Sequence, residues 1–135
     1  MQFAGAGDNY PIRQQIKEMY QKDGKTPPAL MANTVYYNRG LFNAAIEVQA
    51  IANALRTTHG RQPTGTDIKA GMEQIHDFTL GGLVPPLQIT PTDHEGGGWV
   101  RIFRVQGEGL VPVTDWFNAY RDAVWKAVKA AEAQG

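Results

Sequence analysis

The sequence predicts a chain that mixes helices with a few strands, α/β in class and α+β as an isolated unit. We expect about four helices, one short strand and a late β-hairpin, in a single unit covering 1–135. Apolar residues recur at helical spacing through most of 11–79, after a loose lead-in at 1–9. Alternating apolar residues predict strands and a hairpin within 83–113, and a last amphipathic run predicts a helix over 114–133.

Composition narrows the function classes. The 135 residues include 13 basic and 13 acidic side chains, so the basic excess typical of nucleic-acid binding is absent. The sequence contains no run of 18 apolar residues, so it predicts no membrane span. The first residues lack the pattern of a signal peptide. Without cysteine, the chain has neither disulfides nor thiolate metal sites.

Three helices are expected in the first part of the chain. Proline 11 suits the first turn of one helix, and Gly24 suits its left-handed end. A longer helix is expected over 35–58, closed by the pair His59-Gly60. Its apolar stripe consists of Leu41, Ala45, Val48, Ala52 and Leu55.

The later elements are shorter. Thr66 is expected to cap a third helix, in which Gly71 carries a penalty of about 1 kcal/mol. A short strand is predicted over 83–90, followed by strands at 99–105 and 110–113 joined by a turn. Thr114 and Asp115 are expected to cap the final helix, whose apolar face includes Phe117, Tyr120, Val124, Ala127, Val128 and Ala131.

The segment Thr90–Trp99, TPTDHEGGGW, raises the question of a metal or acid–base centre. Neither His59 nor His76 forms a metal-ligand spacing with His94. Adjacent side chains on an extended chain point to opposite faces, so Asp93, His94 and Glu95 cannot easily share one ion. Aspartate, histidine and glycine tolerate the backbone angles of turns, and a structural turn is therefore the favoured interpretation.

Other catalytic patterns are missing from the sequence. The chain contains no serine, and a threonine nucleophile would have to stand at the N-terminus, where Met1 and Gln2 are found. The glycine clusters at 5–7 and 96–98 match neither phosphate-binding motif. The sequence therefore predicts no enzyme, no metal site and no cofactor.

A cluster at the start of the second helix could bind a small molecule. Tyr36, Tyr37, Asn38 and Arg39 lie where backbone N–H groups at a helix N-terminus favour an anion such as a carboxylate. The alternative is that the tyrosines pack in a core and Arg39 is a surface charge.

Short motifs spread along the whole chain carry a family resemblance. In chain order they are Tyr37-Asn38-Arg39-Gly40, Asn43-Ala44, Val48 to Leu55, Gly60 to Gly65, Asp77-Phe78, Gly81-Gly82-Leu83, Pro85 to His94, Glu95-Gly96-Gly97, Val100-Arg101 and Val111 to Trp116. Together they resemble the C-terminal part of the type I periplasmic solute-binding proteins, which serve ABC transporters for branched-chain amino acids, amides and aromatic acids.

The resemblance implies a function and a site. It implies a two-lobed fold that closes on a solute and delivers it to a membrane permease in the periplasm, without catalysis. It places the helix start near the cleft, so Tyr36 and Tyr37 are the expected solute contacts, with Asn38 and Arg39 beside them. It also makes TPTDHEGG a turn before the hairpin.

The resemblance covers roughly the last third of such a protein, so we expect a truncated portion that lacks most of the ligand cleft. Its helical stripes over 41–55 and 117–131 would then be exposed unless they meet each other or another chain. The alternative function is a self-associating structural or interaction module, a homo-oligomer with no ligand of its own.

Overall fold

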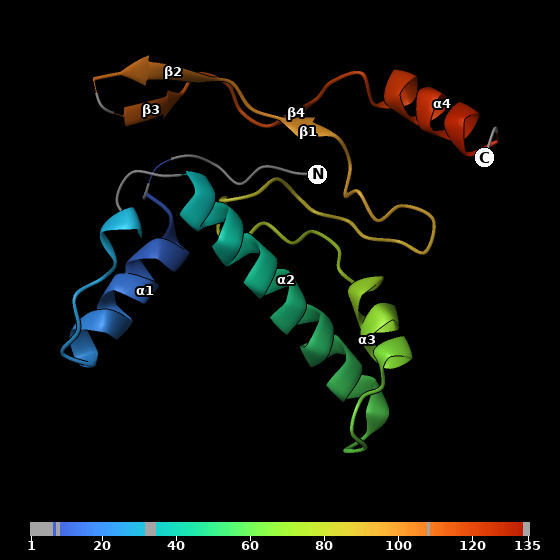
Figure 1. Ribbon diagram of the computed structural model, residues 1–135, viewed down its shortest axis with the longest axis horizontal. Coiled ribbons are helices and arrows are strands. Elements are labelled where there is room, and N and C mark those ends of the chain that lie inside the picture. Colours follow the sequence, from blue (N-terminus) through green and yellow to red (C-terminus); the bar gives the residue numbers. More distant parts are fainter. Residues whose placement is uncertain (1–6, 8, 32–34, 108, 134–135) are drawn as a thin grey trace.

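The computed structural model describes residues 7, 9–31, 35–107 and 109–133 (Figure 1), so most of the expected lead-in lies outside the described residues. The predicted mixture of helices and strands is confirmed. The described helices are α1 (Pro11–Lys22), the 3₁₀ turn η1 (Ala29–Met31), α2 (Val35–Thr58), α3 (Gly65–Met72) and α4 (Arg121–Glu132). The strands are β1 (Trp99–Val100), β2 (Phe103–Gln106), β3 (Gly109–Pro112) and β4 (Phe117–Asn118).

The first two helices follow the sequence closely. Proline opens α1, and Gly24 stands just beyond its end with a left-handed φ of 65°. The long helix α2 has the predicted span. His59 and Gly60 end it, with φ values of 50° and 89°. Both terminations use the left-handed conformation that stops helical hydrogen bonding.

Among the described helices and strands, α2 and α3 pack together most extensively. Gly71 of α3 is buried, and a Cβ atom at this position would lie 2.3 Å from the carbonyl oxygen of Ala50 and 2.9 Å from the nitrogen of Ala54. The side-chain amide of Asn53 donates to the Gly71 carbonyl over 2.7 Å. Glycine is therefore required here by the approach of two backbones, which outweighs its low helix propensity.

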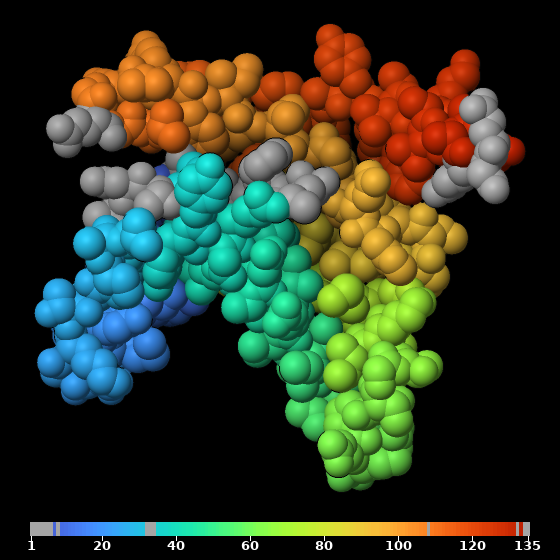
Figure 2. All heavy atoms as spheres, viewed as in Figure 1, coloured from blue at the N-terminus to red at the C-terminus, as the bar shows by residue number. Residues whose placement is uncertain are grey.

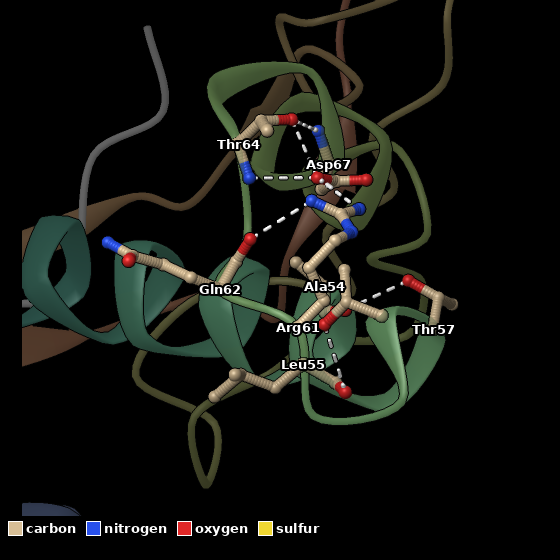
Figure 3. Close-up of polar contacts among 8 residues, drawn as sticks. Ala54, Leu55, Thr57, Arg61, Gln62, Thr64 and Asp67 are labelled. Carbon is tan, nitrogen blue, oxygen red and sulfur yellow. Dashed lines mark hydrogen bonds and ion pairs between the residues drawn. The ribbon is translucent and has the colours of Figure 1, made fainter.

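A capping box starts α3 after the short loop that follows α2 (Figure 3). The cap is Thr64, so the expectation of Thr66 was wrong. The Asp67 carboxylate accepts hydrogen bonds from the Thr64 backbone N–H over 2.8 Å and from the Thr64 hydroxyl over 2.6 Å. Arg61 adds an ion pair of 2.8 Å to the same carboxylate. In a capping box, the side chains of the cap and of the residue three positions later each bond to the other's backbone N–H. Asp67 stands three residues after Thr64, so Thr64 is the cap and Thr66 is not.

These hydrogen bonds, led by the one from the Thr64 hydroxyl, lower the pKa of Asp67 from 3.8 to about 2, with a further contribution from Arg61. A lowered folded-state pKa stabilises the fold when the group is ionised. The contribution of Asp67 is therefore complete above its ordinary pKa near 4 and is lost as the pH falls through about 2.

The segment 83–90 does not form the expected strand, and its first two residues, Leu83 and Val84, belong to a turn. Its backbone pairing consists of two isolated bridges, Phe78 with Leu87 and Thr90 with Asp93, and of a hydrogen bond from Ile89 to the Ile75 carbonyl over 2.9 Å, because no second strand runs beside it in the described residues. Its alternation is nevertheless real, since Leu87 and Ile89 are buried while Gln88 is exposed. The buried core around it consists of Phe42, Ala50, Ile75, Leu83, Val84, Leu87 and Ile89.

The strands and α4 form an arm, residues 99–133. The predicted hairpin is confirmed as β2 antiparallel to β3, and β1 pairs with β4. The final helix begins at Arg121, later than the expected Thr114. The Thr114 hydroxyl accepts from the Ile102 backbone N–H over 3.0 Å, and its carbonyl accepts from Arg101 over 2.9 Å. Thr114 is thus held by the neighbouring strand segment and cannot cap a helix.

The arm stands as a separate tier over the helices (Figure 2), and among the described residues none of its strands or helices packs closely along α1, α2 or α3. The expected exposure of the helical stripes is found only in part, because Leu41, Ala45 and Ala52 of the α2 stripe are half-buried. Val48 has 66% of its surface exposed, and Ile51, Leu55 and Val124 are also exposed. A compact 14.8 kDa monomer exposes about 7,000 Å² by the usual scaling, whereas this chain exposes 9221 Å².

We predict that Gly71→Ala lowers the free energy of unfolding by about 1–3 kcal/mol, because the added methyl group forces the backbones of α2 and α3 apart. Urea unfolding followed by circular dichroism measures the change. Gly40→Ala is the matched control, since Gly40 lies within α2 with open space around it. It should raise stability by up to about 1 kcal/mol through helix propensity alone. Equal effects of the two variants would contradict the backbone contact.

Candidate functional site

The four residues expected to bind solute occupy the first turn and a half of α2. Tyr36 projects into solvent, with 77% of its surface exposed, whereas Asn38 is fully buried. The Asn38 amide donates to the Gly7 carbonyl over 2.8 Å, which ties the start of α2 to the chain before α1. Tyr37 and Arg39 are half-buried. The structure therefore gives Asn38 a structural contact and leaves Tyr36 the most accessible member of the cluster.

A fifth residue, Arg13 of α1, joins this cluster. Its guanidinium lies over the ring of Tyr37, with 4.8 Å from Cζ to the ring centroid, and Nη2 donates to the Met31 carbonyl. The side chain is only 1% exposed. Sequence reasoning missed Arg13 because arginine is usually a surface residue. Its spacing from Ile16 and Tyr20, three and seven positions along a helix, would have placed it on the apolar face.

A polar cavity of about 510 Å³ lies elsewhere, between the extended segment and the arm. Gln88 and Thr90 line one side, and Arg121 and Asn118 line another. Its volume lies within the range of small-molecule sites, although such sites are mostly more apolar. Residues 36–39 do not contribute to it. The only sequence signal for this cavity was the alternation of polar with apolar residues, which turns Gln88 and Thr90 away from the core.

The interpretation of TPTDHEGGGW as a turn is confirmed. Thr90 and Asp93 exchange backbone hydrogen bonds of 2.9 and 3.2 Å. The Asp93 carboxylate accepts from the backbone N–H groups of Glu95 and Gly96 over 2.9 and 3.3 Å. Its second oxygen forms an ion pair of 2.7 Å with Arg121 at the start of α4. Asp93 therefore closes the turn and also joins the helical tier to the arm.

The neighbouring His94 points to a different partner. Its Nε2 lies 3.0 Å from a carboxylate oxygen of Glu73, next to α3. The pKa of Glu73 is lowered, first by its hydrogen bond to Lys69 and then by the one to His94. Asp93 and His94 therefore serve separate contacts. Within the described ranges, no three histidine or acidic residues gather as a metal site would require.

Two solved structures share the fold of this chain. An ABC transporter permease from the Pseudomonas fluorescens group is 28% identical, with a TM-score of 0.81 over 97% of this chain and 34% of its own length. The resemblance to the type I solute-binding proteins is confirmed. A branched chain amino acid ABC transporter from Thermus thermophilus with bound valine is 24% identical, with a TM-score of 0.70 over 93% of this chain. At that identity, the second likeness shows a shared fold alone.

The chain spans about a third, 34%, of the length of both solved structures. No protein-family model matches the sequence, and no curated protein is significantly similar to it. Among the described helices, none combines the length and apolar character needed to cross a membrane.

We predict that Asp93→Ala lowers the free energy of unfolding by about 1–2 kcal/mol, because two backbone N–H groups and Arg121 lose their acceptor. Asp93→Asn should have a smaller effect, since an amide oxygen still accepts the backbone hydrogen bonds. Chemical denaturation measures both.

Arg121→Gln is the control for the ion pair. Arg121 is half exposed, so this change should cost less than about 1 kcal/mol. If Arg121→Gln proved as damaging as Asp93→Ala, the ion pair would outweigh the turn, contrary to this account.

Proposed function

We propose that this chain is part of the solute-binding component of an ABC transporter, which binds solute and passes it to a membrane permease in the periplasm without catalysis. The solutes would be branched-chain amino acids or related small carboxylates, amides or aromatic acids. The observation that carries the proposal is the shared fold over 97% of the chain with an ABC transporter protein.

The start of α2 is the proposed solute contact. Tyr36 is exposed there, and Tyr37 stacks on a buried cation. A helix N-terminus adds a positive potential that favours the carboxylate of an amino acid or aromatic acid. In this proposal Tyr36 and Tyr37 contact the solute directly, Arg39 lies beside it, and Asn38 holds the helix start in place.

We predict weak binding by the chain alone, with Kd near or above about 1 mM, because the matching structures devote about two thirds of their length to other segments. Nuclear magnetic resonance titration with valine, benzoate and acetamide is the measurement. Backbone signals of residues 35–39 should shift, and Tyr36→Ala should remove the shifts.

Tyr120→Ala is the matched control, because Tyr120 is an exposed tyrosine that precedes α4 in the other tier. It should leave the titration unchanged. Shifts confined to the polar cavity near Arg121 would move the solute site away from α2. Nanomolar binding would show that the chain holds a complete cleft, contrary to the proposal.

A second candidate function is a self-associating structural or interaction module. The exposed area supports it, since the excess of about 2,000 Å² over a compact monomer is what each partner contributes to a large permanent interface. The exposed apolar side chains lie on both tiers, at Val48 and Ile51 of α2 and at Val105 and Val111 of the hairpin.

We predict that sedimentation equilibrium detects dimers or larger species over a concentration range from about 1 µM to 1 mM, because this apolar area favours association. The paired change Val48→Lys with Ile51→Lys should shift the chain toward the monomer. Glu47→Lys is the control, since it adds positive charge to α2 at an exposed polar position. A folded monomer throughout this range would exclude the module and leave the solute-binding role.

A further inference from the structure

Arg13 is a buried cation whose hydrogen bonds are incomplete. Of its three nitrogens, Nη2 donates to the Met31 carbonyl, whereas Nε and Nη1 have no partner. No carboxylate forms an ion pair with Arg13 in the part of the chain that the structure describes. The side chain is 99% buried, so bulk solvent does not reach these nitrogens.

Such an arrangement is unfavourable unless an anion completes it. Buried charged groups are almost always paired, because desolvation of an unpaired charge is far more costly than that of a neutral polar group. Tyr37 compensates only in part, since its ring accepts the cation face-on and leaves the N–H edges unused.

The chemistry of the two free nitrogens selects the partner. Carboxylates bind guanidinium groups along an edge, through two parallel N–H groups. The side edge of Arg13 includes Nε and the end edge includes Nη1, so each edge retains an unpartnered nitrogen. Nη2 takes part in both edges and already donates one N–H to Met31, so a carboxylate fits the edge that keeps its second N–H, whereas a neutral amide would supply only one acceptor oxygen without charge.

The position of Arg13 indicates which carboxylate it takes. The guanidinium lies between Met31 and Tyr37, beside the N-terminal end of the 24-residue helix α2. The positive end of that helix adds to the attraction for an anion. Tyr36, the exposed tyrosine of the proposed site, lies in the same turn as Tyr37.

We propose that Arg13 binds the carboxylate of the solute, with Tyr37 holding the guanidinium in place. This assignment rests on the proposed function for the identity of the ligand as a small organic acid or amino acid. Because Arg13 is buried, the carboxylate reaches it only when the side chains over it move aside. The residue then selects acids against amides of the same shape.

The first experiment observes the guanidinium of the unaltered chain. Nitrogen-15 spectra of the Arg13 Nε–H and Nη groups are recorded during titration to about 100 mM with isobutyrate, isobutyramide or chloride at equal ionic strength. We expect a saturable shift of the Arg13 signals with isobutyrate only. An equal shift with chloride would show a general anion effect and would overturn the assignment of a carboxylate site.

The second experiment uses variants. Arg13→Gln should weaken isobutyrate binding by about 10- to 100-fold, as expected for the loss of a charge-assisted hydrogen bond. Arg13→Lys should lose part of the affinity, because it keeps the charge without the planar edge. Arg56→Gln is the control, since Arg56 lies near the opposite end of α2. Circular dichroism checks that each variant is folded, and the titration of the unaltered chain stands without them.

The outcomes separate this inference from the proposed function. If isobutyrate and isobutyramide shift Tyr36 and Tyr37 equally while Arg13 is unaffected, the solute site stands and the role of Arg13 is excluded. If neither ligand shifts any residue of α2 or α1, both proposals fail for this chain. A shift of Arg13 with isobutyrate that is lost in Arg13→Gln supports both.

Discussion

The close approach of α2 and α3 is the constraint on which the rest of the helical tier depends. It requires a residue without a side chain at Gly71 and a buried amide, Asn53, that bridges the two backbones. The capping box at Thr64 fixes where α3 starts. The chain after α3 then returns over α2, and its buried residues complete the core. Apolar burial stabilises this core, whereas the hydrogen bond from Asn53 to Gly71 and the capping box at Thr64 determine how α3 lies against α2.

The helix α2 belongs both to the packed core and to the proposed site, because its two ends make different contacts. Its C-terminal half packs against α3, whereas its N-terminal turn carries Tyr36 and Tyr37 and lies against Arg13. Buried polar side chains recur along it, at Asn38, Asn53 and Thr58. Asn38 donates to Gly7 and Asn53 donates to Gly71, so these two amides fix α2 relative to its neighbours at both ends.

Sequence reasoning succeeded where local rules act alone and failed where distant residues compete. The span of α2 follows from its periodicity and from His59 and Gly60, which need no tertiary partner. The start of α4 was misplaced because Thr114 bonds to Ile102 across the arm. The sequence predicts a solute site at residues 36–39, whereas Arg13 joins this cluster only through its tertiary contacts with Tyr37 and Met31.

The thin junction between the two tiers has a consequence for how the molecule melts. Gly96, Gly97 and Gly98 all have left-handed φ values, 82°, 115° and 63°, and the ion pair of Asp93 with Arg121 crosses this junction. Regions that share few contacts open with separate free energies. The arm can therefore lose its structure while the helical core persists. Each tier then unfolds as its own cooperative unit, and a single transition temperature does not describe the unfolding of the whole chain.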